Sequence, residues 1–216
     1  MPRPNDSRAS LIEAAGTLFR RQGYAATGVN QILETAAAKP GSLYHHFPDG
    51  KQELAAVVVD TAAARIAGLL RRALDSDRPV AAVMTAWIDL LIAGLAEDER
   101  DGCPIEPVAT EAVNASSVVR AASARAFHGW CDAIANRLRA DGWRSDDADQ
   151  TAMVLVSQIE GALLLSRVSG DDAALNAFVR LRARLCRPRR SKRQLEMRLL
   201  VAPSFFFFAL ANLFDD

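Results

Sequence analysis

Four residues in a short stretch carry side chains suited to contact a nucleic acid: Lys39, Ser42, Tyr44 and His45. They supply an ammonium, two hydroxyls and an imidazole, which are groups that proteins use on phosphate oxygens and base edges. Apolar residues alternate with them at helical spacing. We therefore expect these four polar side chains to lie on or near the exposed side of a short helix.

Two short helices and a turn would position these side chains. Residues 27–51 read TGVNQILETAAAKPGSLYHHFPDGK. The first part predicts a helix with Thr27 as its N-cap and with Ile32 and Leu33 on its apolar face. Residues 36–38 then form the predicted turn. The second helix starts after this turn and carries the polar face.

The second helix is predicted to have Pro40 in its first turn, where the missing N–H would have no intrahelical partner. Leu43 and Phe47 are four residues apart, so they share a face that can pack on the first helix. Thr27 and Lys51 are placed at helix starts, where hydroxyl, ammonium and backbone N–H groups can meet phosphate. A helix with a buried seam and a hydrogen-bonding face is what a helix-turn-helix places in the major groove.

Several spaced segments agree in order and separation with a known family: LIEAAGTLFRRQGYAATGVNQI, KPGSLYHHF and GKQEL. Over roughly residues 7–54 the chain resembles the DNA-binding domain of TetR/AcrR-type transcriptional regulators. The form GSLYHHFPDGK, with the later GCP, is most similar to the LmrA/YxaF-like branch. This resemblance implies that Tyr44 and Lys51 contact the DNA backbone and that Ser42 and His45 lie nearer to base edges. We expect His46 to be half-buried support.

Two residues depart from the pattern of the family. Ala37 stands where the turn usually has a glycine, and a left-handed backbone at an alanine costs about 1 kcal/mol. Pro40 stands where the branch usually has a lysine, so one phosphate contact is missing or has moved to Lys39. Both departures bear on DNA affinity more than on the fold.

Composition favours an all-α protein. The chain has 216 residues, enough for one large or two small domains with a substantial core. Its formal net charge is zero, which argues against a general polyanion binder. Residues 1–52 carry +2 (six basic, four acidic), residues 53–186 carry −5 (fourteen, nineteen) and residues 187–216 carry +3 (six, three). A mildly basic head on an acidic body suits a protein that touches DNA with one end.

The cysteines indicate neither a metal site nor a disulfide framework. Cys103, Cys131 and Cys186 are far apart and odd in number, so we expect small buried hydrophobic residues, no metal and no cofactor. Cys103 with His128 is the only conceivable nucleophile–base pair, and no oxyanion motif accompanies it. The sequence therefore predicts that the protein is not an enzyme.

Beyond the head, apolar periodicity and turn residues predict a helical body. The expected helices span residues 51–74, 79–96, 103–113, 116–141, 147–168 and 172–185. The second of these is apolar nearly all round, which predicts burial. In the family the first links head to body, so the resemblance implies that its tilt sets the spacing of two heads. The last two helices predict a dimer interface, or alternatively a face that closes the monomer's own core.

A mostly apolar pocket with a few polar groups is expected between the body helices. Taken singly, each candidate ligand contact fits plain core better than a pocket. The candidates are Met84, Trp87, Cys103, Phe127, Trp130 and Gln158.

The predicted organisation is a helix-turn-helix DNA-binding domain at residues 1–50, a ligand-binding and dimerisation domain at 51–186 and an atypical extension at 187–216. The extension joins a basic cluster to an apolar run that is too short and too interrupted by Pro203 for a membrane helix. It is either a poorly packed addition or a membrane-surface anchor. No signal peptide is recognisable, which predicts a cytoplasmic protein for which a membrane partner is unlikely.

These features predict a ligand-responsive transcriptional repressor. It would bind a pseudo-palindromic double-stranded DNA operator as a homodimer, and a small hydrophobic or aromatic effector would release it. The alternative is a helical small-molecule carrier or sequestering protein whose DNA-binding head is weakened at Ala37 and Pro40.

Overall fold

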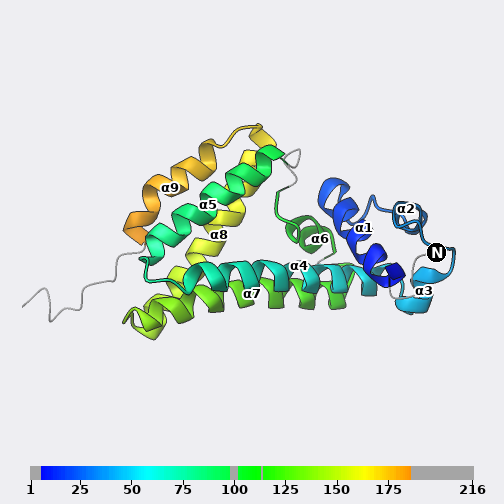
Figure 1. Cartoon of the computed structure of the whole chain (residues 1–216), viewed down its shortest axis with the longest axis horizontal. Helices are drawn as coiled ribbons and strands as arrows, with labels where there is room; N and C mark the ends of the chain where they lie inside the picture. Colours follow the sequence, from blue (N-terminus) through cyan, green and yellow to red (C-terminus); the bar gives the residue numbers. More distant parts are fainter. Residues whose placement is uncertain (1–5, 98–101, 113, 186–216) are drawn as a thin grey trace, which may run out of the picture. The chain divides into compact units, whose positions relative to one another are not determined.

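A computed structural model describes residues 6–97, 102–112 and 114–185, and every regular element in these ranges is an α-helix (Figure 1). The predicted fold class is therefore confirmed. The predicted extension at 187–216 and Cys186 lie outside the described residues. The helices are α1 (Asp6–Gln22), α2 (Val29–Thr35), α3 (Ser42–His46), α4 (Lys51–Leu74), α5 (Val80–Glu97), α6 (Glu106–Ala112), α7 (Ser117–Ala140), α8 (Ser145–Ser169) and α9 (Ala173–Leu185).

The first three helices share a small apolar core. Leu11 and Phe19 on α1 are fully buried with Ile32 on α2, and Leu43 and Phe47 close the core from α3. The spacing of four between the last two residues brings both onto the side of α3 that faces α1 and α2. The apolar seam predicted from the sequence is present, and it fixes which side of α3 remains outside.

The turn between α2 and α3 adopts the left-handed backbone expected there. Ala37 has φ 49°, and among the described residues it is the one non-glycine with a positive φ. Its amide donates to the Glu34 carbonyl at 3.0 Å, and the Ala38 amide donates to the Leu33 carbonyl at 2.9 Å. These bonds close the last turn of α2 and hold the alanine in a conformation that an L side chain disfavours.

The start of α3 differs from the prediction. The helix begins at Ser42, and Gly41 is its N-cap with φ 89°, so Pro40 lies in the preceding turn and not in the helix. A left-handed residue cannot continue a right-handed helix, and this is why the helix cannot start before Gly41. The prediction that Pro40 occupies a first helical turn is therefore wrong.

Helices α4 and α7 pack side by side over their lengths (Figure 1). Gln52 meets Ser116 near the start of α4, and Asp60 pairs with Arg125 one-third of the way along. Further on, the indole of Trp130 donates to the Ala63 carbonyl at 3.3 Å. From one contact to the next, the residue numbers increase on both helices, so α4 and α7 run parallel.

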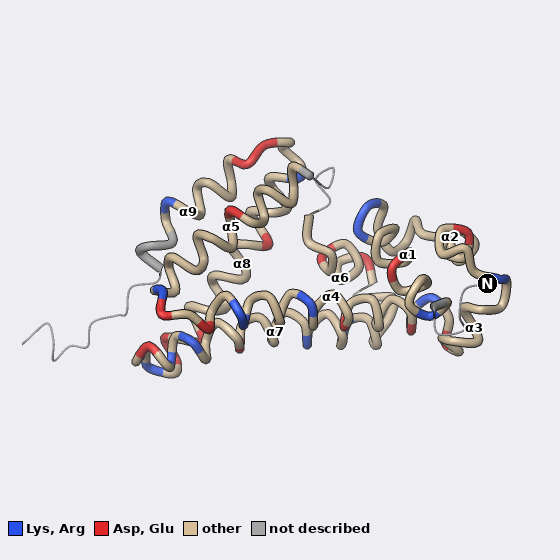
Figure 2. Tube along the Cα trace, in the orientation of Figure 1, with Lys and Arg blue, Asp and Glu red and all other residues tan. Residues whose placement is uncertain are grey.

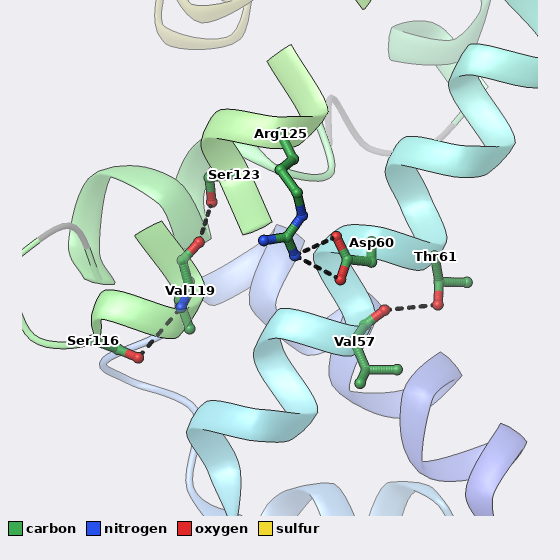
Figure 3. A network of polar contacts seen from close by, with 7 residues as sticks. All are labelled: Val57, Asp60, Thr61, Ser116, Val119, Ser123 and Arg125. Carbon is green, nitrogen blue, oxygen red and sulfur yellow. Dashed lines mark hydrogen bonds and ion pairs between the residues drawn. The ribbon is translucent and has the colours of Figure 1, made fainter. Parts of the chain in front are cut away.

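Figure 3 shows part of this interface. The Arg125 guanidinium donates to both oxygens of Asp60 at 3.1 and 3.0 Å, and the Ser116 hydroxyl caps α7 by accepting from the Val119 amide at 3.4 Å. Thr61 on α4 is exposed, and its hydroxyl donates to the Val57 carbonyl of its own helix. A threonine can satisfy its hydroxyl within its own helix in this way.

Arg137 on α7 closes the far end of α4. Its guanidinium donates to the carbonyls of Leu74, Ser76 and Arg78, with 2.8 Å to each of the last two. These carbonyls lie at or beyond the end of a helix, where no intrahelical N–H remains for them. A guanidinium there also opposes the negative end of the helix dipole.

Helix α5 is less buried than its composition predicted. Val83, Met84 and Ile88 are buried, but Leu90 is 58% exposed. The prediction of burial on every side is wrong for this chain because α5 packs mainly against α9 and α4, which cover one side. Leu69 on α4, an apolar residue at helical spacing, is likewise 37% exposed.

Candidate functional site

The polar face predicted for the head lies on the outside of α3. Tyr44 is 60% exposed, Lys39 and His45 are exposed, and Ser42 is half-buried. Gly50 makes room for the tyrosine: a Cβ at that position would lie 3.2 Å from Cε1 of Tyr44. Lys39, Tyr44 and His45 thus remain accessible outside the apolar seam of Leu43 and Phe47, as a helix that enters the major groove requires.

Charge alone does not make this face a strong anion binder. Lys and Arg are interspersed with Asp and Glu along the trace, and they do not gather into one large basic surface (Figure 2). Contacts to DNA would therefore depend on a few well-placed groups, because phosphate neutralisation supplies the sequence-independent part of affinity.

Thr27 is placed differently from its predicted role. Its side chain is fully buried, and the hydroxyl donates to the Gly23 carbonyl at 2.7 Å while accepting from Gln22 at 3.2 Å. The N-cap of α2 is Gly28, which makes no side-chain cap bond. Thr27 therefore stabilises the connection between α1 and α2, and its buried hydroxyl is not accessible for a contact with phosphate.

Lys51 turns toward the inside of the molecule. Its Nζ lies 4.2 Å from the centroid of the Tyr24 ring, a cation–π contact. Burial lowers the pKa of Lys51, and the carboxylate of Glu111 on α6 opposes that shift. The ammonium predicted to hold phosphate therefore also joins the head to α6.

His46 is half-buried, and its Nε2 lies 2.5 Å from Oγ of Ser7. This hydrogen bond ties α3 to the first turn of α1. It agrees with the expected supporting role of His46, whereas its neighbour His45 is exposed.

The predicted ligand contacts are not all in one place. Met84 is fully buried, and Phe127 and Trp130 stack edge to face at 5.3 Å between ring centroids. Because the Trp130 indole bonds to the backbone of α4, it serves the core. Trp87 is half-buried, and Gln158 lies on the exposed side of α8.

A small cavity lies where the segment before α6 meets α8. Its volume is about 10 Å³, room for about one water molecule. Of the predicted ligand contacts, only Cys103 lines it. The lining residues are Gly102, Cys103, Glu106, Glu160, Leu163, Leu164 and Arg167.

Glu160 is the unusual group in this cavity. Its Oε2 is buried and has no hydrogen-bond partner among the described residues. Burial raises the pKa of Glu160 to about 7, a bond from the Cys103 thiol opposes the shift, and the Glu106 carboxylate adds to it. In the sequence, Glu160 is only an isolated polar residue on an otherwise apolar helix, which gives no signal for this burial.

The cysteine chemistry agrees with a non-catalytic role. Burial first, and then the charge of Glu160, raises the pKa of the Cys103 thiol well above its ordinary value. A thiol held protonated is a poor nucleophile. His128, the other half of the conceivable pair, is exposed on α7. No group of three potential metal ligands occurs within the described ranges.

Two polar contacts attach α6 and α8 to the head, and sequence reasoning missed both. The carboxylate of Glu111 accepts from the Ala25 amide at 2.6 Å. The guanidinium of Arg167 donates to the carbonyls of Arg20 and Arg21 at 3.3 and 3.4 Å. A charged residue on a helix surface gives no sequence signal for a partner more than 80 residues away.

Helix α8 has two apolar sides. Leu155, Ile159 and Leu163 are buried against the rest of the body. The opposite side is exposed and apolar, with Val168 the most exposed at 77%. By length and composition alone α8 could cross a membrane, but the core helix of a soluble protein passes the same test. The exposed apolar residues on α8 and α9 are Met153, Val154, Leu164, Leu165, Val168 and Leu181.

A three-helix head that presents a short polar helix after a turn, carried by an all-helical body, defines a helix-turn-helix DNA-binding regulator. The comparisons with known proteins agree. The model "Bacterial regulatory proteins, tetR family" matches residues 11–58, and "Transcriptional regulator LmrA/YxaF-like, C-terminal domain" matches residues 79–180.

Individual relatives cover most of the chain. It is 34% identical to the HTH-type regulator YxaF of Bacillus subtilis over 79% of this chain and 90% of that one. It is 31% identical to LmrA of the same organism over 79% and 91%. The crystal structure of the regulatory protein TetR from Rhodobacter sphaeroides matches with a TM-score of 0.74 and 26% identity, over 83% and 98%.

The chain therefore belongs to the tetR family of transcriptional regulators, in the LmrA/YxaF-like branch. Its homologues are regulators and not enzymes. Regulators of this family bind DNA and usually act as dimers with small-molecule effectors.

Proposed function

We propose that this regulator is a cytoplasmic repressor that binds a pseudo-palindromic operator as a homodimer and leaves it when a small, mostly apolar effector binds the body. The observation that carries the proposal is the exposed polar face of α3 over its buried seam. Lys39, Tyr44 and His45 are accessible there without any rearrangement of the head core. In this arrangement phosphate contacts set the register and base-edge contacts set the specificity.

The second copy of the chain would cover the outer side of α8 together with α9. Leu155, Ile159 and Leu163 already satisfy the monomer's own core. The exposed side, with Val168 and Leu165, is therefore surplus to that core, which argues against the alternative that these faces only close the monomer. Contiguous exposed apolar surface of this kind marks protein interfaces. Two α8–α9 pairs would form a four-helix bundle.

Release would follow from linkage between the two binding events. An effector weakens operator binding only by its different affinity for the two head arrangements. Two heads in successive major grooves must lie about 34–36 Å apart. Because α4 is held along its length by α7, we expect these two helices to shift together when the spacing of the heads changes.

The test is a fluorescence-anisotropy titration against DNA from upstream of the chain's own gene, with a random duplex as competitor and at two salt concentrations. We expect sequence-preferring binding that weakens with salt. Tyr44→Ala should weaken operator binding at least about 10-fold, since a positioning contact is lost. His128→Ala, which removes an exposed ring from α7, is the matched control and should bind as the unaltered chain does. Equal affinities of all three proteins would contradict the assignment of this face.

The carrier alternative predicts a different result. A head weakened at Ala37 and Pro40 would bind the upstream DNA no better than random DNA. Ala37→Gly relieves the backbone strain at φ 49°. If only this variant bound the upstream DNA with sequence preference, strain at Ala37 would be what disables the head of the unaltered chain. The carrier alternative would then stand.

A further inference from the structure

We propose that the cavity at Glu160 is a binding subsite for the protonated amine of an effector, with the carboxylate of Glu160 as its counter-ion. The effector class is thus a primary amine on an apolar body. The regulatory consequence rests on the proposed function, whereas amine binding itself does not.

The buried oxygen supplies the first argument. Oε2 of Glu160 is shielded from solvent and has no hydrogen-bond partner among the described residues. An unsatisfied buried acceptor is unfavourable, and such groups in native proteins usually have a partner. The cavity that Glu160 lines, about 10 Å³, has room for one small group. An ammonium has the size of a water and brings donors only, so it matches this oxygen.

The lining supplies the second argument. Leu163 and Leu164 provide apolar contacts for the carbon next to the ammonium. Among the described lining residues, the charged groups are two carboxylates, Glu106 from α6 and Glu160 from α8, and one guanidinium, Arg167. That guanidinium is already bonded to carbonyls of α1. The cavity therefore has an excess of negative charge for a cation to neutralise.

The protonation state of Glu160 sharpens this picture. Burial raises its pKa to about 7, so near neutral pH the empty site holds a proton about half of the time. A cation favours the charged carboxylate and lowers that pKa. Binding must then release part of a proton from Glu160, and the ammonium itself keeps its charge. The thiol of Cys103 stays protonated, because its own pKa is raised.

The position of Arg167 links this subsite to the head. Arg167 lines the cavity, and its guanidinium donates to the carbonyls at the end of α1. The side chain of Arg167 also passes close to Gly102, where a Cβ would lie 3.4 Å from its Cδ. The positive charge of an amine beside Glu160 would repel the positive charge of this guanidinium. Occupation would thereby loosen the contact between α8 and α1.

The experiment is isothermal titration calorimetry of the full chain with benzylamine, with benzyl alcohol as the neutral probe of nearly equal size. We expect saturable binding of benzylamine and at least about 10-fold weaker binding of benzyl alcohol, because only the ammonium pairs with the carboxylate. Titrations at neutral pH in two buffers of different ionisation enthalpy should reveal proton release. Glu160→Gln should weaken benzylamine binding at least about 10-fold and abolish the proton release.

Two further variants keep the result decisive. Asp89→Asn removes one exposed carboxylate from α5 and should leave amine binding unchanged. Glu106→Gln weakens the local negative charge without removing the counter-ion, so it should weaken binding by a smaller factor, and it replaces Glu160→Gln if that variant does not fold. Benzylamine binding that is absent, that matches benzyl alcohol, or that survives Glu160→Gln would overturn the proposal. The first of these results would mean that the cavity holds only a water.

The operator titration separates this proposal from the proposed function. If the chain binds benzylamine as described but no operator, the subsite stands and the repressor reading fails. If it binds an operator but no amine, the repressor reading stands and the subsite fails. If both hold, benzylamine should weaken operator binding, and Arg167→Ala should reduce that effect while benzylamine still binds.

Discussion

The body holds the head in two very different ways. The first attachment is α4 itself, which leaves the head at Lys51 and stays paired with α7 as far as Arg137. The second is lateral and polar: Glu111 and Arg167 each reach a backbone group at the end of α1 or just after it. The first attachment buries apolar side chains over its whole length. The second consists of a few hydrogen bonds at partly exposed groups.

The difference shows which attachment can yield. Apolar burial over a long interface is lost only when the helices separate, which is close to unfolding. A few hydrogen bonds to partly exposed groups contribute little net free energy and exchange readily with water. The lateral attachment is therefore the weaker of the two, and under the proposed function we expect an effector to act on it while the α4–α7 pair stays together.

The largest expected effect comes from the α4–α7 interface. Trp130→Ala should lower the free energy of unfolding by about 3–5 kcal/mol, because a buried indole and its bond to the Ala63 carbonyl are both lost. Urea denaturation measures it. Leu90→Ala on the exposed side of α5 is the control and should change stability by less than about 1 kcal/mol. A loss below about 1 kcal/mol for Trp130→Ala would remove the distinction between the two attachments.

Glu160 should give a pH dependence of the folded state. Its pKa is about 7 when folded and near the ordinary 4.5 when unfolded. The folded state thus binds more protons between these values, so the contribution of Glu160 is most favourable below pH 4.5 and is lost as the pH rises to 7. The loss is at most about 3 kcal/mol. Urea unfolding at pH 5.5 and 8 should show it, and Glu160→Gln should flatten the slope.

Arg137→Met should cost about 2 kcal/mol, because three carbonyls at the end of α4 lose a charged donor. The matched control is Arg125→Met on the same helix, which breaks the exposed pair with Asp60 and should cost less than about 1 kcal/mol. Thermal unfolding of both variants compares them directly. Equal losses would mean that closure of the α4 end is no stronger than a surface ion pair.

Ala37→Gly should stabilise the head by about 0.5–1 kcal/mol, since it removes a strained left-handed alanine. The neighbouring residue offers the control: Ala36 has φ −76°, an ordinary helical value, so Ala36→Gly should destabilise. Urea denaturation of the two variants, followed by circular dichroism, distinguishes them. A destabilised Ala37→Gly would show that the alanine methyl makes contacts worth more than the strain.

The smallest effect is expected at the lateral attachment. Glu111→Gln weakens the charge of the acceptor for the Ala25 amide and should lower global stability by less than about 1 kcal/mol. Hydrogen exchange of that amide should nevertheless become faster, while amides inside α7 keep their protection. Faster exchange throughout α7 would show that the two attachments are one cooperative unit.

Much of this arrangement follows from local sequence. The bounds of α4 are the predicted ones, because Gly50 precedes Lys51 and apolar residues recur at helical spacing up to Leu74. The seam of α3 was predictable from Leu43 and Phe47, which stand four apart. Glycines also ended helices as expected, with Gly23 and Gly142 at positive φ. In each case the feature is decided by residues that are close to it in the sequence.

The errors arose where distant segments decide. Thr27 reads as a helix cap, yet its hydroxyl is buried against the carbonyl of Gly23. Gln158 reads as a pocket residue, yet it lies on the outer side of α8. The apolar circumference of α5 predicted burial, and the number of helices that pack on it decided otherwise.

The sequence by itself determined the helices and the buried seam of α3, because backbone preference and apolar spacing act within a few residues; the left-handed turn at Ala37 is held against the preference of alanine. Tertiary structure alone decided which charged side chains meet. Only the packed chain places Arg167 against the end of α1, Glu111 against the Ala25 amide and the carboxyl of Glu160 in a small cavity beside Cys103. The free energy of a charged group depends on its burial and on its partners from distant segments, and the local sequence predicts neither.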